Sequence, residues 1–197
     1  MSKNFDSLPT TAQLEAELER SRKSDAKTSF SPVIAAIYAA LTIMIAAAVL
    51  VYFFPALKIT GNAMNPSLES GDIIVAARFS EVKKGDIGLF RFGNKIMVKR
   101  MVAAGGEIVN IDGEGNLSIN RTIVEEPYIK NKALGQYDLE PDFEVPAGCG
   151  FFMGDNRTAS IDSRLSRIGC PDDDQIIGTM VLRVWPLSRF GTLKKAP

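Results

Sequence analysis

Residues Val33 to Phe54, VIAAIYAALTIMIAAAVLVYFF, divide this chain of 197 residues into two very different parts. The stretch has 22 residues, no charged side chain, and only Thr42 as a clearly polar interruption. As an α-helix rising about 1.5 Å per residue it would extend roughly 33 Å, close to the hydrocarbon thickness of a bilayer. The pattern therefore predicts a single transmembrane helix over residues 33–54.

A cleaved signal peptide and a buried core helix are the other structures that such a stretch can form. The apolar core of a signal peptide is usually about 7–15 residues long and follows a short basic leader. Here the run is longer and 32 residues precede it. A core helix should show a polar face, and this stretch has none. We therefore expect a membrane anchor that is retained.

The charges on either side of the anchor predict its orientation. Lys58 is the only basic residue just after the anchor. Because basic residues stay on the cytoplasmic side, residues 1–32 should be cytoplasmic and residues 55–197 extracytoplasmic. Within residues 1–32, a short solvated helix over Ala12–Lys23 and a disordered segment both remain open. The basic residues before the anchor are Arg20, Arg22, Lys23 and Lys27.

Residues 55–197 alternate short β-rich runs with turn signals such as Lys84-Gly85-Asp86. We expect a mainly β domain, strongly curled or barrel-like and antiparallel. Residues 106–148 are richer in Gly, Asn and acidic residues, which would suit an appended hairpin or small subdomain. The expected strands are Leu57–Thr60, Asp72–Phe79, Ile87–Phe92, Lys95–Ala104, Glu107–Ile111, Asn116–Asn120, Phe151–Met153 and Ile176–Trp185.

The composition excludes several classes of site. The chain has no histidine, which rules out a His-based catalytic triad and a His-ligated metal. Lys plus Arg and Asp plus Glu number 23 each, so the net basic charge of a nucleic-acid binder is missing. Two cysteines, Cys149 and Cys170, are too few for a four-cysteine zinc site. A disulfide between them and a role as small core residues both stay open. We expect no metal and no cofactor.

One lysine sits in an apolar strand. In Lys95–Ala104, KIMVKRMVAA, strand alternation places Lys99 on the same face as Met97 and Met101. Desolvation disfavours an ammonium and lowers its pKa, which can make a lysine a neutral general base. A lysine at a strand edge that extends to water is the alternative.

A dense polar cluster, GDNRTASIDSR, covers Gly154 to Arg164 and stands between two apolar β runs. Its polar groups should therefore be partly buried and hydrogen-bonded to one another. Asp162 and Arg164 are two residues apart, which suits an ion pair on one face of an extended segment. Ser160 lies on the same side and could hold a nearby lysine amine by a hydrogen bond.

Three stretches resemble, in order and spacing, the motifs of the bacterial type I signal peptidases. These proteins are membrane-anchored serine endopeptidases that use a Ser/Lys dyad. ITGNAMNPSLESGDIIV, from Ile59, resembles the box that carries the nucleophile, and MVKRMVAAGGEIV, from Met97, resembles the lysine box. FFMGDNRTASIDSR, from Phe151, resembles the Gly-Asp-Asn-Arg signature. The resemblance extends over residues 33–190.

The resemblance implies a role for each matching residue. Ala63 occupies the position of the nucleophilic serine, and Lys99 that of the general base. Ser160 matches a serine that orients the lysine, while Asp162 and Arg164 match a supporting ion pair. The expected reaction is acyl transfer, in which water releases the acyl-enzyme.

Further expectations concern the substrate. Gly61 lies where some members carry a serine in the oxyanion hole, so the backbone N–H of Ala63 is the expected donor. Ile59, Met64 and Ile96 are expected to line shallow pockets for the small residues at the end of a signal peptide. The implied partners are signal peptides of secreted preproteins and membrane lipid, with no nucleic acid. We expect a monomer in the bacterial cell membrane.

Alanine at position 63 changes the expected activity. Loss of a serine nucleophile costs on the order of a million-fold in turnover, so this chain should be inactive. One explanation is a Ser→Ala change in a competent enzyme. The other is a natural non-proteolytic relative that binds or assembles secreted proteins or pilins. The presence of Lys99, Ser160, Asp162 and Arg164 favours the first.

Overall fold

The computed structural model describes residues 10–25 and 31–193, and the chain forms two compact units, residues 1–47 and 48–197. Helix α1, Thr11–Asp25, begins after Thr10, whose backbone N–H and hydroxyl both donate to the side-chain oxygen of Gln13. This helix is one of the two structures left open for that segment. Its side chains through Arg22 are exposed.

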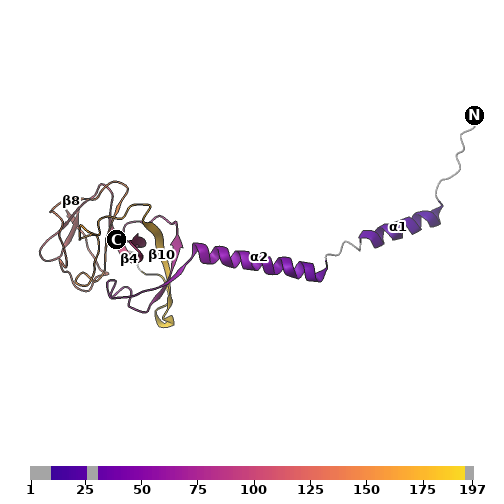
Figure 1. The fold of residues 1–197 in the computed structure, drawn as a ribbon, viewed down its shortest axis with the longest axis horizontal. Helices are drawn as coiled ribbons and strands as arrows, with labels where there is room; N and C mark the ends of the chain where they lie inside the picture. Colours follow the sequence, from indigo (N-terminus) through magenta and orange to yellow (C-terminus); the bar gives the residue numbers. More distant parts are fainter. Residues whose placement is uncertain (1–9, 26–30, 194–197) are drawn as a thin grey trace, which may run out of the picture. The chain divides into compact units, whose positions relative to one another are not determined.

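Helix α2, Pro32–Phe53, confirms the long apolar helix within one residue at each end (Figure 1). None of its residues is buried, and its mean hydropathy reaches 2.6 over the most apolar window. Among the described helices it is the one long and apolar enough to cross a membrane. Its length and composition fit a single-pass anchor.

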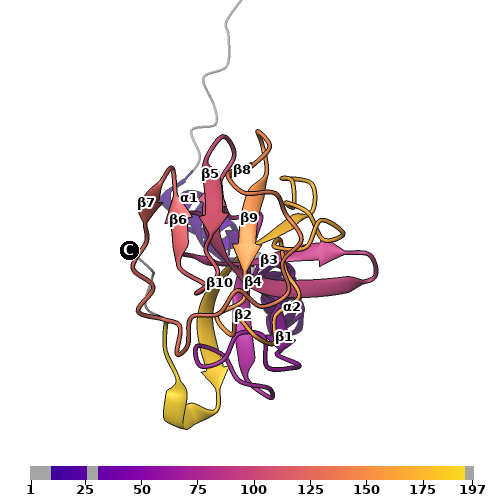
Figure 2. The same ribbon diagram turned by 90° about the vertical axis from the view of Figure 1, so that its left-hand side faces the viewer.

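All eight expected strands are present, with ends shifted by at most two residues. Six strands form one antiparallel sheet in the order β1-β2-β10-β3-β4-β9 (Figure 2). Their bounds are β1 Ala56–Lys58, β2 Ile73–Arg78, β3 Ile87–Phe92, β4 Lys95–Ala104, β9 Gly150–Met153 and β10 Ile176–Trp185. After β10 the chain forms a short 3-10 helix, η2, over Leu187–Arg189.

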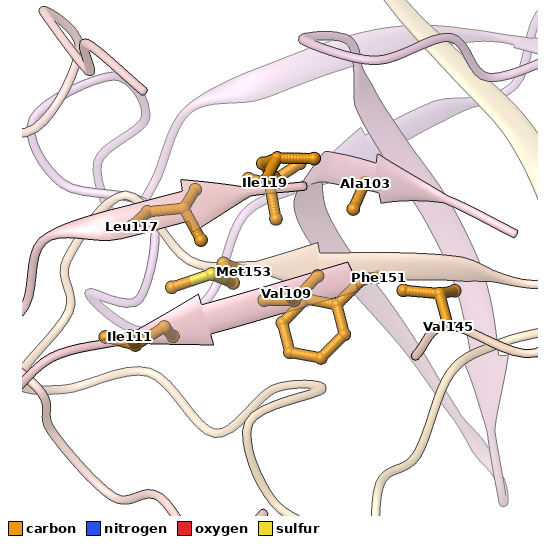
Figure 3. Packing of buried hydrophobic residues seen from close by; sticks show 9 residues of the cluster. Ala103, Val109, Ile111, Leu117, Ile119, Val145, Phe151 and Met153 are labelled. Carbon is orange, nitrogen blue, oxygen red and sulfur yellow. The ribbon is translucent and has the colours of Figure 1, made fainter. Parts of the chain in front are cut away.

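A smaller antiparallel sheet has the order β7-β6-β5-β8. Sequence patterns missed two of its strands, because each has only two residues and shows no alternation. Figure 3 shows the apolar side chains packed between this sheet and β9, with Val109 and Phe151 facing each other. Both cysteines are free thiols that pack against this cluster. The strands are β5 Ile108–Ile111, β6 Leu117–Ile119, β7 Thr122–Ile123 and β8 Phe143–Glu144.

Strand β9 is buried on both faces, and it links two apolar clusters. Alternation directs Phe151 and Met153 into the cluster of Figure 3 and Phe152 into a second one. There the ring of Phe152 lies 5.0 Å from the ring of Phe90, centroid to centroid. The continuous apolar run FFM follows from this position between two layers.

The expectation of a barrel-like closure is wrong, because the described sheets stay open. The edge of β9 that would have to meet β1 is occupied by the polar loop that follows it. The backbone N–H of Ser163 donates to Phe152 O at 3.0 Å, and the Ser163 hydroxyl accepts from Phe152 N–H at 3.1 Å. Because the backbone N–H and C=O of Phe152 are already bonded, this edge of β9 does not offer them to another strand.

Replacing Phe152 by alanine should destabilise the β domain strongly. The side chain is fully buried, so its loss leaves a cavity at the junction of the sheet and costs about 3–5 kcal/mol in free energy of unfolding. Phe190→Ala is the matched control, since 59% of that side chain is exposed. Urea unfolding followed by circular dichroism would measure both, and similar losses would contradict the assignment of Phe152 to the core.

Candidate active site

A pocket of about 270 Å³ opens between the segment after β1 and the first half of β4. It brings together six of the nine residues that the sequence singled out, from parts of the chain more than 30 residues apart: Ile59, Gly61, Ala63, Met64, Ile96 and Lys99. Ser160, Asp162 and Arg164 do not line it but lie behind Lys99. The remaining lining residues are Leu57, Lys58, Thr60, Met97 and Val98.

The turn that carries Ala63 depends on Gly61. Its φ is +83°, a left-handed conformation that glycine adopts readily, and a Cβ at this position would meet no atom within 4 Å. Glycine is therefore favoured here by the backbone conformation rather than by packing. After the turn, the N–H of Leu68 donates to Met64 O at 2.9 Å and closes the segment.

The amine of Lys99 is buried and directed by a hydrogen bond. The residue is 4% exposed, and its Nζ donates to the Ser160 Oγ at 3.0 Å. The pKa of Lys99 is lowered from 10.5 to about 8, chiefly by burial; Asp162 opposes the shift, Arg164 adds to it, and Asp155 opposes it. A substantial fraction of this amine is therefore neutral at mildly alkaline pH.

Asp162 and Arg164 form a fully buried ion pair with two contacts. Arg164 Nε donates to Asp162 Oδ1 at 2.8 Å and Nη2 to Oδ2 at 3.0 Å, and Oδ2 also accepts the N–H of Gly154 at 2.9 Å. Burial alone would raise the pKa of Asp162, but the hydrogen bonds and charge of Arg164, with smaller contributions from Ser160 and Gly154, hold it below its ordinary value.

The loop after β9 positions residue 63 through its backbone. The N–H of Asn156 donates to Ala63 O at 3.0 Å. A Cβ on Gly154 would lie 2.5 Å from that same oxygen and 2.2 Å from the Ser160 hydroxyl. Glycine at position 154 is thus required for the turn of Ala63 and the partner of Lys99 to approach each other.

Two other buried arginines were not singled out by the sequence. Arg100 contacts both carboxylate oxygens of Asp155, at 2.9 and 2.7 Å, and its guanidinium lies 4.1 Å from the ring centre of Tyr128. Arg157 forms a buried ion pair with Glu126. Asp155 and Arg157 belong to the quoted GDNR stretch, but nothing in the pattern around Glu126 points to such a partner.

This arrangement is suited to proton transfer next to an open pocket. A buried amine with a lowered pKa is held by a hydroxyl, and residue 63 lines the same pocket. The methyl group of Ala63 has neither an acidic proton nor a nucleophilic atom. Within residues 10–25 and 31–193, no group of three or more Cys, Asp or Glu side chains could hold a metal ion.

The family model described as signal peptidase, peptidase S26, matches residues 32–185. Signal peptidase I U of Bacillus subtilis (strain 168) is 36% identical over 171 residues, which cover 78% of this chain and 88% of the relative. Signal peptidase I of Bacillus caldolyticus is 31% identical over 166 residues, covering 76% of this chain and 90% of that protein. A crystal structure of a signal peptidase I from Enterococcus faecalis V583 aligns with a TM-score of 0.43 at 26% identity, over 51% of this chain and 97% of that one.

The lowered pKa of Lys99 predicts how stability depends on pH. Between about pH 8 and 10.5 the unfolded chain binds a proton at this residue that the folded chain has lost. The contribution of Lys99 to stability therefore rises with pH across this window, by up to about 3 kcal/mol. Denaturant unfolding at pH 7.5 and 10.5 should show that Lys99→Met removes this part of the pH dependence.

Lys95→Met is the control, because Lys95 is exposed on the same strand. It should leave the difference in unfolding free energy between the two pH values as in the parent chain. If both variants changed that difference equally, the burial of the Lys99 amine would not be its cause.

Proposed function

Because this chain belongs to the signal peptidase family, peptidase S26, we propose that it binds the signal peptides of secreted preproteins in the pocket between Ala63 and Lys99. The observation that carries this proposal is the shared pocket itself. It places residue 63 beside a buried lysine whose amine is already directed by Ser160. The apolar side chains of Ile59, Met64 and Ile96 would receive the small side chains that precede the cleaved bond.

We assign residue 63 to the nucleophile and Lys99 to the general base of a serine endopeptidase. In the serine form, the neutral Lys99 amine takes the hydroxyl proton while the serine oxygen attacks the peptide carbonyl. The backbone N–H of residue 63 stabilises the oxyanion, and the lysine ammonium returns its proton to the leaving amine as the C–N bond breaks. Water activated by the same lysine then releases the signal peptide.

The rest of the machinery acts on Lys99 and not on the substrate. Ser160 fixes the direction of the amine, and the ion pair of Asp162 with Arg164 holds the loop that presents Ser160. These three residues are positioning residues in this proposal. With α2 as the anchor and the basic residues before it in the cytoplasm, residues 55–197 would work at the outer face of the membrane.

Ala63 favours a second candidate function, a natural binding or assembly factor for secreted proteins or pilins. Such a factor would keep the pocket and lose the cleavage. The retained lysine argues against it, because a buried amine of lowered pKa is costly to keep without a use. We therefore prefer a competent enzyme whose serine has been replaced by alanine.

Restoring the serine should restore cleavage. The variant Ala63→Ser, purified in detergent, is expected to process a preprotein at least about 10⁴-fold faster than the parent chain, since a lost nucleophile costs on the order of 10⁶ in turnover. Gel analysis of signal-peptide removal measures this. A folded Ala63→Ser protein that binds the preprotein and leaves it uncut would favour the binding factor instead.

The double variant Ala63→Ser, Lys99→Ala tests the assignment of the base. Its activity should fall back to the level of the parent chain. Activity that survived the loss of Lys99 would show that a different residue takes the proton. Ala63→Ser, Lys95→Ala is the matched control for removing a lysine from the same strand and should cleave normally.

The pH profile of the Ala63→Ser variant should report the Lys99 amine. Only the neutral amine can accept the proton, so kcat/KM should rise with pH and reach half of its plateau near pH 8. Peptide cleavage measured from pH 6 to 10 gives this profile. A plateau already reached by pH 6.5 would contradict a lysine with this pKa as the base.

A further inference from the structure

A second pocket, of about 280 Å³, borders the turn that follows residue 63. Asn65 and Pro66 line it, directly after Met64, which lines the first pocket. Asn156 also lines it, and its backbone N–H is the group that holds Ala63 O. The two pockets are thus lined by consecutive residues of one short turn, Ala63 and Met64 in the first and Asn65 and Pro66 in the second.

The lining of this second pocket is polar, in contrast to the apolar side chains of the first. It combines amide and hydroxyl groups with carboxylates and one lysine, which can bond to a peptide backbone in either direction. The lining residues include Asn65, Pro66, Glu69, Lys130, Asp155 and Asn156.

The charges around this pocket leave one cation without a partner. Asp155 is neutralised by its two contacts with Arg100, and Glu69 Oε1 lies 2.6 Å from Arg189 Nη1. Lys130 is exposed and makes no ion pair or side-chain hydrogen bond with any residue that the structure describes. Lys130 is therefore the cation of this pocket that a ligand's acidic group could pair with.

We propose that this polar pocket receives the first residues of the mature protein, those that follow the cleaved bond, and that Lys130 selects an acidic side chain there. The proposal rests on the proposed function, because it assumes that an extended peptide lies with its small residues in the first pocket. Such a peptide passes residue 63 and must continue beyond it. The pocket beyond the turn offers polar groups to its backbone and a cation to one side chain.

Binding to the parent chain tests this directly, because Ala63 leaves the peptide uncut. We would use the full chain in detergent micelles and labelled peptides that share one signal-peptide end and differ at the first four mature positions. Each position carries Asp, Ala or Lys in turn, and fluorescence anisotropy gives the Kd. At one position Asp should bind about threefold to tenfold more tightly than Lys at low ionic strength, and added salt should reduce the ratio.

Three variants assign the preference to Lys130. Lys130→Glu should reverse it and Lys130→Arg should retain it. Lys132→Glu is the matched control, an exposed lysine two residues along that bonds to Asn116 and does not line the pocket. A preference that persisted in Lys130→Glu, or that vanished equally in Lys132→Glu, would overturn the assignment.

A peptide that ends at the cleaved bond separates the two proposals. If it binds as tightly as every longer peptide, the second pocket contributes nothing and this inference is wrong, while binding of signal peptides stands. If neither the short nor any long peptide binds, both proposals are wrong. Equal Kd values for all charge variants of the long peptide would overturn the selection of an acidic residue.

Discussion

The amine of Lys99 lies where a positive charge is poorly solvated, and much of the surrounding structure follows from this constraint. A carboxylate alone beside this amine would stabilise its charged form and raise the pKa of Lys99. Asp162 does oppose the lowering, but Arg164 is bound to it and acts in the opposite direction on the same amine. The two members of the ion pair therefore act on the pKa of Lys99 in opposite directions, and burial is the largest cause of its lowering. Ser160 can then direct the amine without adding charge.

Three buried arginines hold the same loop, two through ion pairs with other parts of the protein and one through an ion pair inside the loop. Each guanidinium has a carboxylate partner: Asp155 with Arg100 of β4, Glu126 with Arg157, and Asp162 with Arg164 within the loop. Buried pairs of this kind are weak evidence for stability, because desolvation offsets much of their attraction. The two-pronged contacts of Arg100 with Asp155 and of Arg164 with Asp162 instead restrict how the loop can lie. Through Glu126, the segment between β7 and β8 helps to set the position of the site.

Much of the fold could be predicted because its signals are local. An uncharged run of 22 residues and the alternation of β4 need no knowledge of distant partners. The candidate site could be predicted only as far as short motifs reach, and these were enough to single out Ala63, Lys99 and Ser160 as candidates. Strands of two residues leave no periodicity to detect. Glu126 could not be found, because a buried carboxylate looks in sequence like a solvated one until its partner 31 residues away is known.

The bonds between Ser163 and Phe152 have a consequence for how this protein can fail. They cover the outer edge of β9, a strand with apolar side chains on both faces. An uncovered edge of that kind is a template for pairing with another copy of the chain. The loop that supplies the cover also carries Ser160 and Asp162. A substitution that loosens the loop would therefore remove the support of Lys99 and expose an aggregation-prone edge at the same time. Variants that lose the geometry of the site in this way should also lose solubility.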